Sequence, residues 1–194
     1  MSRVLVLTIS AVMCGTVHAS PTPLEDRTYP LGDCAHVGFP PVIKMTKGTY
    51  KFPLNGGVNE IELVSSMLGE LNNNKEKFDL VKLACSLDGA NTVTTEYFLF
   101  NSSGVLVDRL DESRIKYDYL QYLNTLTNSD TDTDYRSGQE DVSFNGGDLV
   151  VKSMLGGYPG DAKWVVTTRY KLNKSSILEA RETPTISLSN NVSN

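Results

Sequence analysis

Histidine, tryptophan and cysteine are scarce in this chain of 194 residues, which has 2, 1 and 3 of them. A catalytic zinc site generally uses two or three histidines, and a serine triad needs one beside its nucleophile. The sequence also has no glycine-rich phosphate loop, no dinucleotide-binding fingerprint and no G-x-S-x-G turn around a serine. We therefore expect no cofactor and no catalytic residue of these classes, which leaves carboxylate chemistry as the open enzymatic route.

The chain also has few positively charged residues and few long apolar runs. The 18 lysines and arginines are outnumbered by 23 aspartates and glutamates, which gives a net charge of −5. Nucleic acid is not an expected partner, because contacts to phosphates need clustered basic side chains. No stretch after residue 19 approaches the run of about 18 apolar residues that a membrane-spanning helix needs. We therefore expect no membrane span.

The first 19 residues have the pattern of a secretory signal peptide. Arg3 supplies a positive charge, residues 4–12 are apolar, and Val17-His18-Ala19 ends in a small residue suited to cleavage. The alternatives are an uncleaved N-terminal anchor and a lipoprotein cut before Cys14. The signal predicts a periplasmic or secreted protein whose mature chain begins at Ser20.

Two cysteines, Cys34 and Cys85, remain once the signal is removed. A cysteine pair in an exported chain generally forms a disulfide bond. In the chain-entropy model, closing a loop of this length stabilises the fold by about 4 kcal/mol. The alternative is a buried free cysteine beside a reactive one. We expect the disulfide, which would tie the N-terminal arm to the strand that contains Cys85.

Alternating and β-branched segments predict a mainly β fold. The expected strands cover residues 49–54, 58–64, 78–87, 92–100, 105–110, 148–155, 163–172 and 177–181. Between them, apolar residues at helical spacing predict one amphipathic helix over about 112–127. Its tyrosines are expected to pack in the core, and the alternative is that they form a binding surface.

Two parts of the chain look alike. Thr94–Leu99 and Thr167–Leu172 share a Thr-Thr-x-Tyr-x-Leu pattern, and each precedes a polar turn and a short apolar strand. A three-stranded meander cannot bury both of its faces, so two copies would complete one core. The alternative is two unrelated strands of similar composition. We expect two β-meander repeats packed into one domain with the helix between them, and with Tyr97 and Tyr170 facing the core.

Composition divides the chain into four parts. After the signal peptide (1–19), the proline-rich residues 20–47 are expected to form an extended arm. Residues 48–182 are expected to form the β-rich domain, and the polar residues 183–194 a disordered tail.

Two loops contain the candidate binding residues. Asp130, Asp132 and Asp134 alternate as oxygen ligands do at the start of a calcium loop, but the glycine of the turn and the final glutamate are missing. We expect a solvated acidic loop over residues 128–141, with a weak calcium site as the alternative and no other metal. Tyr158, in a glycine-rich loop, and the nearby Trp164 are the candidate contact surface for a ligand or partner.

Three stretches together resemble one family of known proteins: Asn55–Ile61 (NGGVNEI), Phe78–Val81 (FDLV) and Tyr97–Phe100 (YFLF). The chain is similar in these stretches to small periplasmic β-proteins of the carbapenem intrinsic-resistance family. Residues 149–151 and 170–172 match the closing strands of that family. The resemblance implies an exported, non-enzymatic protective protein, and it assigns no site residue.

We therefore expect an exported binding protein of the protective, immunity or inhibitor type. Its partner would be an envelope-targeting toxin or enzyme, or an antibiotic-related small ligand. An acidic protein suits a basic partner, because complementary potentials speed association. One alternative is a secreted carboxylate-dependent hydrolase acting on glycans, which needs two acids about 5–9 Å apart in a cleft. The other is a small-ligand carrier, which needs a cavity of several hundred Å³.

Overall fold

The computed structural model describes residues 22–54, 57–72, 76–88, 93–127, 137–155, 164–181 and 183–188, and its fold is mainly β, as expected. The elements in chain order are η1 (Leu24–Asp26), β1 (Thr28–Pro30), α1 (Asp33–His36), β2 (Val42–Lys44), β3 (Thr49–Leu54), β4 (Gly57–Glu70), β5 (Lys77–Ser86), β6 (Val93–Asn101), β7 (Leu106–Asp111), α2 (Glu112–Thr127), β8 (Ser137–Asn145), β9 (Asp148–Leu155), β10 (Trp164–Leu172), β11 (Leu178–Ala180) and β12 (Thr185–Leu188).

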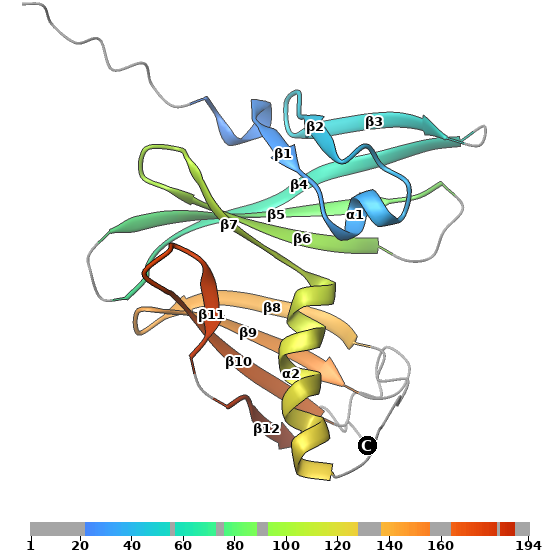
Figure 1. Cartoon of the computed structure of the whole chain (residues 1–194). Coiled ribbons are helices and arrows are strands. Elements are labelled where there is room, and N and C mark those ends of the chain that lie inside the picture. Colours follow the sequence, from blue (N-terminus) through green and yellow to red (C-terminus); the bar gives the residue numbers. More distant parts are fainter. Residues whose placement is uncertain are drawn as a thin grey trace, which may run out of the picture.

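These strands form two antiparallel five-stranded sheets and one small ribbon (Figure 1). The first sheet has the strand order β3-β4-β5-β6-β7, so each strand pairs with its neighbour in the sequence. The second sheet has the order β11-β10-β9-β8, and β12 pairs with the other end of β10. The ribbon consists of β1 and β2. Helix α2 connects the two sheets and lies across the second one (Figure 1).

The central strand of the first sheet, β5, is buried on both faces. Phe78 and Leu80 belong to the core on one face. Leu83 and Cys85 belong to the core on the other face. A fully buried Leu or Phe contributes about 1.5–3 kcal/mol relative to an exposed one, so a strand that is apolar on both sides needs a cover on both sides.

The N-terminal segment covers one of these faces. Tyr29 is fully buried and makes an edge contact with the ring of Phe98, with the ring centroids 5.0 Å apart. Cys34 and Cys85 form the expected disulfide, with Cα atoms 6.0 Å apart, which joins α1 to β5. The segment is more ordered than the expected extended arm, because it contains η1, α1 and the β1–β2 ribbon.

The second sheet and α2 complete the core on the other face. The predicted helix over 112–127 is confirmed as α2, and its Ile115 and Tyr119 are fully buried. Tyr97 and Tyr170 both lie in this core, with 3% and 0% exposure, as the repeated pattern predicts. The core therefore draws its side chains from both sheets and from the helix between them.

The two meanders also share the geometry of their last hairpins. Strands β5-β6-β7 and β9-β10-β11 follow each other in the same order. Each hairpin turn begins at an asparagine whose Oδ1 accepts the N–H groups two and four residues further on, at 2.8–3.1 Å: Ser103 and Val105 for Asn101, and Ser175 and Ile177 for Asn173. The resemblance between the two segments is thus a shared strand order and a shared turn.

Three expectations about local structure are wrong. Strand β4 continues from Val64 to Glu70, because β5 pairs with it along that length. Strand β8 occupies 137–145, where an acidic loop was expected to extend to Asp141, because its backbone pairs with β9. Residues 185–188 of the expected disordered tail form β12, which pairs with β10. In each case backbone pairing with a distant or neighbouring strand outweighs a weak local pattern.

Within the described ranges, no helix has the length and apolar character needed to cross a membrane.

Candidate functional site: a buried polar junction

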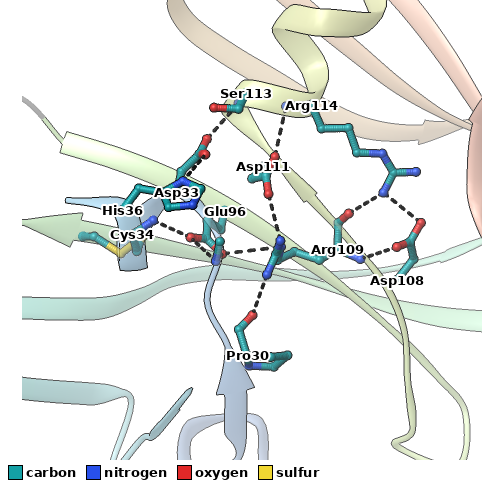
Figure 2. Close-up of polar contacts among 12 residues, drawn as sticks. Pro30, Asp33, Cys34, His36, Glu96, Asp108, Arg109, Asp111, Ser113 and Arg114 are labelled. Carbon is teal, nitrogen blue, oxygen red and sulfur yellow. Dashed lines mark hydrogen bonds and ion pairs between the residues drawn. A yellow bond between two sulfur atoms is a disulfide. The ribbon is translucent and has the colours of Figure 1, made fainter. Parts of the chain in front are cut away.

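A buried carboxylate, Glu96, lies between the N-terminal segment and β6. Its side chain is 0% exposed. The Gly32 N–H donates to both carboxylate oxygens at 3.0 Å, and the Cys34 N–H donates to Oε1 at 2.7 Å (Figure 2). These are the first N–H groups of α1, which have no partner inside the helix. Glu96 therefore fixes the start of α1 on the sheet, beside the disulfide.

Arg109, on β7, is the cation of this junction. Its Nη2 lies 3.1 Å from Asp111 Oδ2, and its Nε lies 3.9 Å from Glu96 Oε2. Its Nη1 donates to the Pro30 carbonyl oxygen at 3.1 Å. The guanidinium thus partly compensates two carboxylates and holds β1 at the same time.

Burial dominates the electrostatics of Glu96 and raises the pKa of its carboxyl above the ordinary value of 4.5. The two backbone N–H donors and Arg109 act in the opposite direction, since they stabilise the charged form, and Asp111 adds to the rise. The protonated form is therefore more favourable in the folded protein than in an exposed glutamate.

The junction also holds the beginning of α2. Asp111 is the residue before the helix, and its Oδ1 accepts the Arg114 N–H at 3.0 Å. Asp33, on α1, accepts the Ser113 N–H at 2.7 Å. Both carboxylates lie at the positive end of the helix dipole, where a negative charge is stabilising. Three parts of the chain, namely α1, the β6–β7 pair and α2, therefore meet at one set of polar contacts (Figure 2).

A glycine, Gly32, lies where these parts meet, because the Arg109 and Asp111 side chains occupy the space that a Cβ atom would need. A Cβ atom on Gly32 would lie 2.5 Å from Asp111 Oδ2 and 2.6 Å from Arg109 Cζ. Real Cβ atoms do not make contacts this short, so a side chain at this position would displace the ion pair.

The junction is closed to a substrate, because its central carboxylate has no exposed surface. A second feature is open: a cleft of about 130 Å³ between the two sheets, lined in part by Lys82, Tyr97 and Asp141. The Lys82 Nζ lies 5.5 Å from the centre of the Tyr97 ring. This cleft has one carboxylate among its lining residues, whereas glycoside hydrolysis needs two. Its volume is also below the several hundred Å³ of a small-molecule carrier.

The side chains of the other sequence-predicted site residues lie outside the part of the chain that the structure describes. Asp130, Asp132, Asp134 and Tyr158 lie outside the described residues. Trp164 begins β10, where its backbone pairs with Leu155 and Leu188 in the neighbouring strands, and its side chain is outside the description. Among the residues that are described, no three His, Cys, Asp or Glu side chains are grouped as a metal site requires.

Sequence reasoning missed Glu96, Arg109 and Asp111. One signal was present: Glu96 is the single acid within the apolar strand Thr94–Phe100. A charged residue is rarely buried without partners, so an acid in such a strand indicates a paired or hydrogen-bonded group. The N–H groups that it accepts come from 62 and 64 residues earlier in the chain, and no local pattern marks them.

Comparison of the chain with family models, curated proteins and solved structures found no match.

Proposed function

We propose that this chain is an exported binding protein of the protective or inhibitor type, whose partner is a basic protein of the cell envelope or its surroundings. The observation that carries the proposal is the buried Cys34–Cys85 disulfide, which fastens the N-terminal segment to the centre of the first sheet. Such bonds persist in oxidising compartments, and reducing conditions make them rare in the cytosol. The signal-like sequence of residues 1–19 points to the same compartment.

The use of the polar residues supports binding rather than catalysis. Glu96, whose pKa is raised, is fully buried and holds α1 in place. Arg109 and Asp111 are occupied by the same junction. A catalytic carboxylate with a raised pKa needs access to its substrate, and Glu96 has none. The net charge of −5 suits a basic partner, since complementary potentials accelerate association.

Capture from an envelope extract tests this function. The oxidised mature protein is immobilised, the extract is passed over it, and each retained protein is purified and titrated in solution. We expect one basic protein that binds with a fixed stoichiometry and more weakly at high salt. Retention of nothing above the level of an unrelated acidic control protein would contradict the proposal. Turnover of a glycan substrate would instead support the hydrolase alternative.

A further inference from the structure

The second half of β4 is an open strand edge. β5 pairs with β4 from Glu60 to Glu70. On the other side, β3 pairs with β4 only as far as Glu62, which lies opposite Thr49. The Leu63 N–H still donates to the Gly48 carbonyl oxygen at 2.9 Å, and beyond it no described strand pairs with residues 64–70 on that side. Figure 1 shows β4 continuing past the end of β3.

This edge has few of the devices that usually protect an open strand: a bulge at one end, but no charge or proline along its uncharged stretch. Residues 64–69 (VSSMLG) contain no charge and no proline. Val64 and Leu68 are 53% and 61% exposed. The bulge between Leu63 and Ser65 lies next to the first residue of β3, where the pairing between β3 and β4 stops, at one end of the open part. Natural sheets generally interrupt such an edge with lysine, proline or a cover, because its unpaired N–H and C=O groups recruit another strand.

We propose that residues 64–70 of β4 form the partner-binding edge, to which an extended segment of the partner adds as a strand in line with β3. This inference rests on the proposed function and names the surface that performs it. Backbone hydrogen bonds to an exposed sheet edge give affinity, and alternate side chains give specificity.

The surroundings of the edge favour a single strand over a second copy of this chain. Phe144 of β8 lies over Gly69, so closely that a Cβ atom on Gly69 would be 2.0 Å from the Phe144 Cγ. The second sheet therefore stands beside this part of β4. A second copy would bring its own second sheet to the same place, whereas a single strand needs only the width of the open edge.

Charge indicates the chemistry of the added segment. The uncharged stretch lies between Glu62 and Glu70, which are both exposed. The place opposite Glu62 is taken by Thr49 of β3, so Glu70 is the acid that an added strand can face. A partner strand with lysine or arginine opposite Glu70, followed by an uncharged, β-branched run, would place opposite charges across from each other. Its alternate apolar side chains would meet Val64 and Leu68. A segment with an acidic residue opposite Glu70 would be repelled.

A titration with a designed peptide tests the edge. The probe is the capped peptide Lys-Thr-Val-Thr-Val-Thr-Val, which places valines opposite Leu68 and Val64 when its lysine faces Glu70, added to the oxidised protein labelled with ¹⁵N. We expect saturable changes concentrated in the backbone amides of residues 64–70. The same peptide with an N-methyl group on every residue keeps its charge but has no backbone N–H donor on either edge, so it should not bind. Equal binding of both peptides would overturn the proposal, and so would no binding at millimolar concentration.

Two matched variants separate the edge from general charge effects. Leu68 and Val58 have the same exposure, 61%, and lie on the same strand, but Val58 is already paired with Pro53 of β3. Leu68→Lys should weaken peptide binding at least about tenfold, which corresponds to the loss of a well-made contact. Val58→Lys adds the same charge and should change binding by less than about twofold. Similar losses in both variants would overturn the proposal.

The two proposals can fail separately. If a captured partner binds the Leu68→Lys variant as tightly as the original chain, the edge proposal is wrong and the binding function stands. If the edge binds the peptide but no partner is captured, the proposed function is the part that fails. Concentration-dependent protection of residues 64–70 without peptide would show that a second copy occupies the edge, and would overturn the proposed occupant.

Discussion

The side-chain amide of Asn72 pairs with the backbone of Leu172, one hundred residues further along the chain. Asn72 Nδ2 donates to the Leu172 carbonyl oxygen at 2.8 Å, and the Leu172 N–H donates to Asn72 Oδ1 at 3.2 Å. The Asn72 N–H also donates to the Gly147 carbonyl oxygen at 2.7 Å. Asn72 follows β4 of the first sheet, and its side chain pairs with the backbone of β10 in the second sheet as a neighbouring strand would. It therefore fixes the two sheets against each other.

Replacing Asn72 should therefore weaken the whole fold. Asn72 has a positive φ of 58°, so Asn72→Gly removes the amide without adding backbone strain. The loss of two hydrogen bonds should lower the free energy of unfolding by about 1–3 kcal/mol, measured by urea denaturation. Asn72→Asp keeps the acceptor and should cost less than Asn72→Gly if the Leu172 N–H contact matters most. A Gly variant as stable as the original chain would show that the sheets are held elsewhere.

The buried Glu96 should give the protein a specific pH dependence. Its folded pKa is raised, so the folded state binds this proton more tightly than the unfolded state does. The stability from this group is fully present below about pH 4.5 and is lost as the pH rises through the folded pKa. Glu96→Gln keeps an acceptor for the two N–H groups and cannot ionise. Its unfolding free energy should therefore rise relative to the original chain as the pH increases from 4 to 7.

Glu62→Gln is the control for this measurement, since it removes a carboxylate from an exposed position on β4. Each variant is compared with the original chain by the difference in the free energy of unfolding. If this difference changes with pH as little for Glu96→Gln as for Glu62→Gln, the buried carboxylate does not titrate as described. Glu96→Ala should be the least stable of the set, because it leaves the Gly32 and Cys34 N–H groups without their acceptor.

The disulfide should contribute strongly to stability. Replacing Cys34 and Cys85 together by alanine releases the N-terminal segment in the unfolded state, and should cost about 2–5 kcal/mol in the free energy of unfolding. Thermal melts of the double variant and of the oxidised chain measure the difference. Thiol labelling of the unfolded, unreduced mature protein should find no free thiol. Labelling of both cysteines would contradict the bond.

Tyr170 should be a core residue whose hydroxyl is hydrogen-bonded. Its side chain is fully buried, and its hydroxyl donates to Asp118 Oδ2 on α2 at 2.8 Å. Tyr170→Ala should cost about 3–5 kcal/mol in the free energy of unfolding, whereas Tyr170→Phe keeps the ring, loses the hydroxyl and should cost about 1–2 kcal/mol. Tyr117→Ala, at a tyrosine that is 62% exposed on the same helix, is the control and should melt near the original chain.

Much of the fold follows from patterns along the chain. The run of apolar and β-branched residues in β6 predicts a strand, and the helical spacing of Ile115 and Tyr119 predicts α2. The cysteine count predicts the disulfide. In these segments the residues that form the local pattern are the ones that the fold buries, so the predicted secondary structure is also the observed one.

The polar junction and the open edge depend on distant contacts instead. Glu96 is held by N–H groups from 62 and 64 residues earlier, which a pattern within one strand cannot reveal. The second half of β4 has few buried side chains, and its strand structure comes from pairing with β5. β8 is similar, since polar residues form a strand there because β9 offers its backbone. Apolar sequence patterns indicate which side chains are buried. They do not reveal these elements, because backbone hydrogen bonds to neighbouring strands define them.

Native mass spectrometry can test export, the disulfide and partner binding together, on tagged protein isolated from the extracytoplasmic fraction without denaturation. We expect a chain that lacks its first 19 residues, has the mass of one disulfide, and forms a stoichiometric complex with one basic protein. Recovery of the full-length, reduced chain from the cytosolic fraction, with no bound protein, would contradict this expectation.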